Sequence, residues 1–144
     1  MVDHVLVPVD DSPLAETALD FALAEFPDAH LTLLHVINPV EGSYAADPTY
    51  GDVWYDDQWF DTARDRAEDL LDDLTEQARD HAGTVDAEWV VGRPAREIVS
   101  FAEDNDVDHV VMGSHGRTGF DRILVGSVAE TVMRRSPAPV TVVR

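Results

Sequence analysis

Cysteine and lysine are both absent from this chain of 144 residues. Without cysteine, disulfides, thiol redox chemistry and thiolate metal sites are excluded. No apolar run is long enough to cross a bilayer, and the N-terminus has a strand pattern rather than that of a signal peptide, so we expect a cytoplasmic protein. The length and the hydrophobic content of 44% suit one domain over residues 1–144.

Positive charge is scarce. Asp and Glu number 29 against 10 basic residues, all of them arginine, and the formal net charge is −19. We therefore expect neither nucleic acid nor an anionic membrane as a partner, because both carry the same sign of charge as the protein. We interpret the acidity as adaptation to high salt, as in a halophile, since salt screens such charges within a few ångströms. The alternative is an ordinary acidic cytosolic protein.

Short apolar runs alternate with helical patterns along the chain. Buried strands are predicted at 4–9, 31–37, 85–91, 107–112 and 139–143, and helices at 13–26, 60–78, 95–102 and 128–135. Ser12 and Pro13 are typical of an N-cap followed by the first helical residue. This alternation predicts an α/β fold, a doubly wound, Rossmann-like parallel sheet of five strands in the order 3-2-1-4-5 with helices on both faces.

A sheet with this order binds ligands where the order reverses, at the carboxyl ends of its first and fourth strands. Asp3-His4-Val5 opens the first predicted strand and Asp108-His109-Val110 opens the fourth, so we expect both strands to start at the same depth. The turn at Pro8, Val9 and Asp10 then emerges beside Gly113. We predict that the two segments are walls of one pocket.

The segment 113–127 joins the fourth strand to the last helix and contains Gly113, Gly116 and Gly126. Glycine lets the backbone approach a ligand closely, and a helix N-terminus presents free N–H groups and partial positive charge. The segment therefore predicts a phosphate site. Its spacing is neither that of a Walker loop, since Gly-Lys-Ser/Thr is absent, nor that of the dinucleotide fingerprint.

The spacing Gly-x2-Gly-x9-Gly-Ser, which ends at Ser127, resembles that of ATP-binding members of the universal stress protein (UspA-like) family. Other similar segments are Val9-Asp10 before Ser12, Leu34-His35-Val36, Gly92-Arg-Pro94 with Ile98, and the closing strand from Pro137. The resemblance implies an adenine nucleotide α-hydrolase-like fold that binds ATP with Mg²⁺ or Mn²⁺. It also implies a homodimer through strand 139–143, paired antiparallel across a two-fold axis.

The resemblance further implies a set of nucleotide-binding residues: Pro8, Val9, Asp10, Val36, Met112, Gly113, His115, Gly116, Arg117, Gly126, Ser127 and Val128. Asp10 is expected to accept hydrogen bonds from ribose hydroxyls or to meet a metal ion, and the alternative is that it caps the following helix. Val36 is expected to offer backbone groups to the adenine edge, although most valines in such strands are core residues.

Three of these residues have competing interpretations at the phosphate end. His115 is expected to act through its backbone N–H, with its ring in solvent. Arg117 suits a phosphate but could equally pair with a surface acid such as Asp121. Ser127 forms a Ser-x-x-Glu pattern with Glu130, so it either caps the last helix or contacts phosphate when ligand is bound.

Two classes of function remain. The first is an ATP-binding stress-response or signalling module with slow hydrolysis at most. The second is an adenine-nucleotide-dependent enzyme, a hydrolase or phosphotransferase, for which the sequence offers no lysine, no nucleophile beside a base and no distinct acidic cluster. A dimeric scaffold with a vestigial pocket is a third option, which the three glycines oppose. The aromatic-rich connection 38–57 could close over adenine, meet a partner or pack onto the long helix.

Overall fold

Strands and helices alternate through the computed structural model, which describes residues 1–39, 57–114 and 125–144. The elements are β1 (His4–Pro8), α1 (Pro13–Glu25), β2 (His30–Ile37), α2 (Asp57–Gln77), β3 (Val85–Val91), α3 (Pro94–Asp104), β4 (His109–Gly113), α4 (Ser127–Arg135) and β5 (Val140–Val143). Both α1 and α3 begin with a proline, whose fixed φ suits the first turn and whose missing N–H costs nothing there.

The five strands form one sheet in the order β3-β2-β1-β4-β5, and every neighbouring pair is parallel. This confirms the predicted fold and strand order. The central strands β1 and β4 lie side by side, with Val5 opposite His109 and Leu6 opposite Val110. They start within one residue of the same depth, and the order reverses between them, so a crevice is expected at their carboxyl ends.

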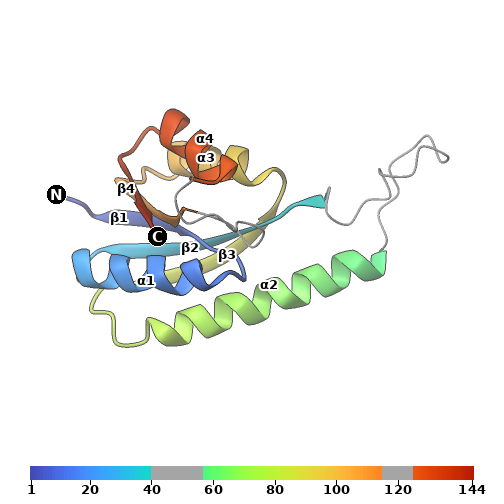
Figure 1. Ribbon diagram of the computed structural model, residues 1–144. Coiled ribbons are helices and arrows are strands. Elements are labelled where there is room, and N and C mark those ends of the chain that lie inside the picture. Colours follow the sequence, from blue (N-terminus) through green and yellow to red (C-terminus); the bar gives the residue numbers. More distant parts are fainter. Residues whose placement is uncertain (40–56, 115–124) are drawn as a thin grey trace.

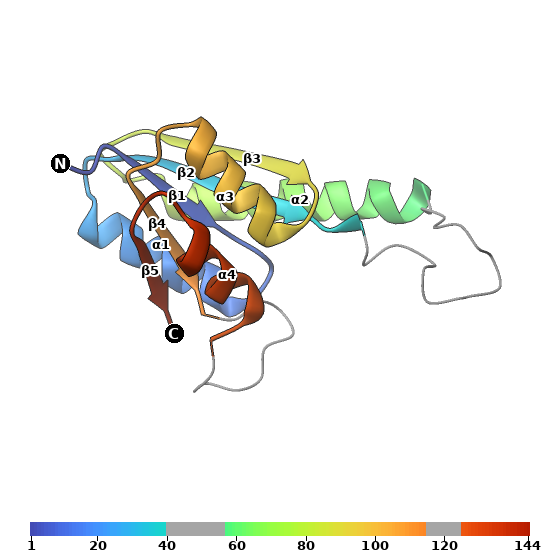
Figure 2. The same cartoon turned by 90° about the horizontal axis from the view of Figure 1, so that it is seen from above.

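Helices cover both faces of the sheet, with α1 and α2 on one face and α3 and α4 on the other (Figures 1 and 2). Alternate residues of a buried strand serve opposite faces: Val5 and Val7 pack toward α1, whereas Leu6 packs toward α3 and α4. The sheet therefore lies between two apolar cores, one on each of its faces. In the described ranges, every helix is too short or too polar to span a bilayer.

Element boundaries differ from the sequence predictions by a few residues. β1 ends at Pro8 rather than at residue 9, and β4 covers His109–Gly113 rather than 107–112. α2 begins at Asp57, three residues before the predicted start, so the helix is longer at its N-terminal end than the apolar pattern indicates. Strand and helix ends depend on which backbone groups find partners, and apolar periodicity does not specify this.

Candidate functional site

A cavity of about 720 Å³ lies at the carboxyl ends of β1, β2 and β4. Nine residues predicted for the site line it together: Pro8, Val9, Asp10, Val36, Met112, Gly113, Gly126, Ser127 and Val128. The remaining three, His115, Gly116 and Arg117, lie outside the described residues, as do Asp121 and most of the aromatic-rich connection. The described part of the predicted site is thus brought into one place by the topology.

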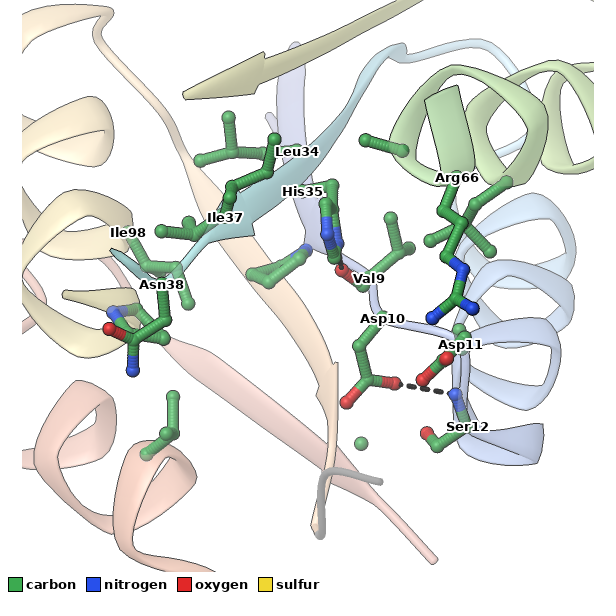
Figure 3. A pocket seen from close by; sticks show the side chains of 18 of the residues that line it. Val9, Asp10, Asp11, Ser12, Leu34, His35, Ile37, Asn38, Arg66 and Ile98 are labelled. Atoms are coloured by element: carbon green, nitrogen blue, oxygen red, sulfur yellow. Dashed lines mark hydrogen bonds between the residues drawn. The ribbon is translucent and has the colours of Figure 1, made fainter. Parts of the chain in front are cut away.

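The turn after β1 forms one wall of the cavity (Figure 3). Val9 donates its N–H to the Leu34 carbonyl at 2.9 Å, and the Nδ1 atom of His35 lies 2.9 Å from the Val9 carbonyl. Because a carbonyl only accepts, Nδ1 carries the proton in this contact. These two bonds hold the turn against β2 and fix where Asp10 leaves the sheet.

Asp10 uses one of its oxygens to hold the short turn between β1 and α1. Its Oδ1 accepts a hydrogen bond from the Ser12 N–H at 2.9 Å, and its other oxygen points away from α1 (Figure 3). Asp10 therefore does not cap α1, because the N–H that it binds belongs to the N-cap residue and not to the helix, and its second oxygen is directed elsewhere. A carboxylate held in this way can accept from a donor in the cavity without losing its structural contact.

The opposite wall is formed by the end of β4 and the start of α4. Ser114, which is buried, donates its N–H to the Val143 carbonyl at 2.7 Å and accepts from the Gly126 N–H at 2.6 Å. Gly126 is therefore hydrogen-bonded directly to the residue after Gly113, although Ser114 and Gly126 are 12 positions apart in the sequence. This places the N-terminus of α4 beside the end of β4, where its first N–H groups border the cavity.

The capping-box prediction for Ser127 is wrong. Gly126, not Ser127, is the N-cap of α4, and no side-chain capping bond forms there. Glu130 lies one position too far along the helix for the box and instead pairs with Arg134, with 2.6 Å between Oε1 and Nη2. Ser127 is exposed at the cavity edge. Because its hydroxyl does not cap α4, helix capping does not explain why a serine stands at this position.

Sequence reasoning missed a third wall, which the first turns of α2 supply. Its residues are Gln58, Trp59, Thr62, Ala63, Arg66, Ala67 and Leu70. Ala63, Ala67 and Leu70 belong to the apolar pattern that predicts the helix 60–78, but nothing in that pattern indicates that this part of the helix borders a ligand cavity. Arg66 is the one arginine among the described lining residues, and its side chain extends toward Asp11 (Figure 3).

The described residues contain no group of three or more His, Asp or Glu side chains that could hold a metal ion. Asp10 and Asp11 are the carboxylates of the described lining. A divalent ion in this cavity would thus take most of its ligands from elsewhere, such as the oxygens of a bound phosphate or water.

Comparison with known proteins agrees with this arrangement. A family model described as "Universal stress protein family" matches residues 1–144. Universal stress protein MJ0577 of Methanocaldococcus jannaschii is 32% identical over 157 residues, which cover 100% of this chain and 96% of that protein. Its solved structure has a TM-score of 0.83 at 34% identity and covers 99% of this chain and 96% of its own.

Two further structures contain adenine nucleotides. A universal stress protein in complex with cAMP is 26% identical, with a TM-score of 0.69, and the match covers 99% of this chain and 97% of that one. A family protein of Arabidopsis thaliana with AMP bound has a TM-score of 0.69 over 98% of this chain and 90% of its own. At 15% identity the latter likeness is one of fold alone.

Proposed function

The chain belongs to the universal stress protein family, and we propose that it is an ATP-binding stress-response or signalling module. The observation that supports this most is the cavity at the switch point of the sheet, lined by nine of the residues expected to bind nucleotide. A related universal stress protein that contains cAMP supports an adenine nucleotide as the ligand class.

We assign the adenosine half of the ligand to the β1 and β2 side. Val9 and Met112 are buried apolar residues at the cavity wall, and Val36 follows Leu34 and His35 at the end of β2. An apolar slot with a few polar groups suits a purine base. Asp10 would accept hydrogen bonds from the sugar, and Val36 would offer its backbone to the adenine edge.

We assign the phosphates to the N-terminus of α4. Gly113, Gly126, Ser127 and Val128 lie together there, and the helix presents unpaired N–H groups and partial positive charge to an anion. The exposed Ser127 hydroxyl is available because it does not cap the helix. Mg²⁺ or Mn²⁺ would be held mainly by phosphate oxygens and would offset their charge in an acidic protein.

The competing function is an adenine-nucleotide-dependent enzyme. The chain has no lysine, and its described cavity has no carboxylate cluster to assist transfer of a γ-phosphate. We therefore expect slow hydrolysis at most. Turnover of ATP with added Mg²⁺ or Mn²⁺ at rates typical of kinases, on the order of 1–100 per second, would favour the enzyme instead.

Replacing Gly126 tests the phosphate site. Gly126 has φ −65° and ψ 161°, a conformation open to any residue, so Gly126→Val does not strain the backbone. We expect this variant to stay folded and to bind ATP at least about tenfold more weakly, because the side chain takes space where the phosphates approach. Isothermal titration calorimetry measures the affinity, and circular dichroism confirms folding.

The control is Ala87→Val, which makes a similar addition on an exposed position of β3 outside the cavity lining. It should bind ATP as the unmodified chain does. Unchanged ATP affinity in a folded Gly126→Val variant would contradict the proposed site.

We also propose two properties of the whole protein that follow from its sequence. The first is a homodimer through β5, and the second is adaptation to high salt.

A further inference from the structure

The part of α2 that lines the cavity differs in charge from the rest of this helix. Eight of its 21 residues are acidic: Asp57, Asp61, Asp65, Glu68, Asp69, Asp72, Asp73 and Glu76. None of the eight is among the described lining residues of the cavity, which include three exposed polar residues of α2, Gln58, Thr62 and Arg66. Residues four apart lie on one side of a helix, so these three form a row along the cavity. Solvent exposure alone does not explain why acids are excluded from this row.

Arg66 is the positively charged member of this row, and it differs from its neighbour Arg64. Arg64 has its Nη2 atom 3.7 Å from Oδ1 of Asp61 and its Nε atom 4.0 Å from Oδ1 of Asp65. Arg66 takes part in none of the ion pairs found among the described residues, and its side chain extends from α2 toward Asp11 (Figure 3). A guanidinium has five N–H donors, so Arg66 keeps donors available for a group in the cavity.

The charge of the cavity makes this arginine important for any anionic ligand. The described lining residues include two carboxylates, Asp10 and Asp11, and one arginine, Arg66. In a chain with a net charge of −19 and no lysine, an anion is repelled unless a positive group lies near it. The N-terminus of α4 contributes the equivalent of about half an elementary charge. Arg66 contributes a full positive charge from a different wall.

We propose that Arg66 contacts the phosphate groups of a bound nucleotide from α2 and sets the preference of the site for nucleotides that carry more phosphate. This inference rests on the proposed function, because it adds a charge-selecting residue to the same site. The phosphates then lie between the N-terminus of α4 and Arg66, which approach them from different walls. A guanidinium suits this role, since it is always charged and its planar fork can pair with two phosphate oxygens.

Calorimetry with ATP, ADP, AMP and adenosine tests this preference. Arg66→Gln removes the positive charge and changes helix propensity little. It should bind ATP about tenfold more weakly, because a hydrogen bond to a charged group is lost, and should bind adenosine within about twofold of the unmodified chain. The losses for ADP and AMP should fall between these two. Arg64→Gln is the matched control: it removes the same charge from the same helix outside the cavity lining, and it should leave all four affinities unchanged.

A double-mutant cycle separates a ligand contact from an effect on Asp11 alone. If Arg66 contacts the phosphates, Arg66→Gln weakens ATP binding by a similar factor in the Asp11→Asn background and in the unmodified chain. If Arg66 acts only by offsetting the Asp11 carboxylate, the substitution has no effect in the Asp11→Asn background, and the inference is overturned.

Adenosine separates a charge effect from a loss of shape. Equal weakening of ATP and adenosine by Arg66→Gln would show that the arginine maintains the form of the site, and it would overturn the inference. Unchanged ATP affinity in this variant would also overturn it, while the proposed function stands. Failure of the unmodified chain to bind any of the four ligands overturns both.

Arg66→Lys provides a second variant that keeps the positive charge. Arg66 is exposed, so both variants should melt at the same temperature as the unmodified chain without ligand. Arg66→Lys should retain most of the preference for ATP over adenosine, because the ammonium group still attracts phosphate. A folded Arg66→Lys variant that loses this preference as fully as Arg66→Gln would show that charge is not the cause and would overturn the inference.

Discussion

Asp108 ties the amino ends of the two central strands together. Its Oδ2 accepts from the N–H groups of Asp3 and His4, both at 2.9 Å, and its own N–H donates to the His4 carbonyl at 2.8 Å. The bond from Asp3, followed by that from His4, lowers the pKa of the Asp108 carboxyl below its ordinary value of 3.8. The repeated Asp-His-Val motif thus has a structural role: Asp108 of the second copy forms hydrogen bonds with the backbone of Asp3 and His4 in the first copy.

This contact predicts a pH-dependent effect of Asp108→Asn. A carboxyl with a lowered pKa in the folded state adds stability that is complete above about pH 3.8 and is lost as pH falls through the lowered value. Asp108→Asn should therefore lower the urea midpoint near neutral pH, and the difference from the unmodified chain should shrink below about pH 3.8. Glu103→Gln, exposed on α3, is the control. A difference that stays constant or grows at acid pH would contradict this account.

Single residues also show where sequence reasoning stops. The sequence identified Ser12 as an N-cap, and the structure places it there, but Asp10 and not the Ser12 hydroxyl serves the local backbone. A capping box was one of two interpretations of Ser127, and it fails because the helix begins one residue earlier than the box requires. Residue types restrict which hydrogen bonds can form, whereas the choice among them depends on distances that only the folded chain defines.

At the scale of elements, the order of the strands could be predicted almost completely. Five strand patterns separated by helical patterns, with right-handed crossovers, leave few topologies, and the observed order is the expected one. The wall from α2 could not be predicted in the same way. An amphipathic pattern such as Trp59, Ala63 and Arg66 shows which side of a helix is covered, but not which strand ends it overlies.

The edge strand β5 predicts self-association. The carbonyls of Pro139 and Val143 face β4, so by alternation the N–H of Val142 faces the open edge of the sheet. An edge of this kind invites pairing, and a two-fold contact closes it. We expect Val142→Pro to convert a homodimer to a monomer in light scattering, because the ring removes that donor while bonds to β4 remain.

Val142→Ala is the control for the dimer, since it trims the side chain but keeps the N–H. It should remain dimeric. A monomeric unmodified chain at micromolar concentration, or a dimer unaffected by the proline, would show that β5 is not the interface.

At the scale of the whole molecule, the main feature is the large excess of negative charge. The net charge is −19, yet the helices that border the cavity are not uniformly acidic: Arg66 projects from α2, and Arg134 and Arg135 complete the last turn of α4. Pairs such as Arg134 with Glu130 are exposed and contribute little each. Most of the acidic residues therefore repel one another without a compensating partner, and this cost depends on the solvent.

Salt should consequently stabilise the folded chain. The screening length falls from about 10 Å at 0.1 M salt to about 3 Å at 1 M, so repulsion between surface carboxylates largely disappears over this range. We expect the melting temperature to rise steadily from low to molar KCl. Salt also strengthens apolar burial to some degree, so the rise alone does not identify its cause.

A variant with fewer charges separates the two causes. Asp69, Asp72 and Asp73 are exposed on α2, and replacing all three with Asn removes three negative charges while changing helix propensity little. If repulsion sets the salt response, this variant should melt higher than the unmodified chain at low salt, and the two should converge in molar KCl. Parallel curves with the same salt dependence would point to apolar burial instead, and a melting temperature that falls with KCl would contradict adaptation to high salt.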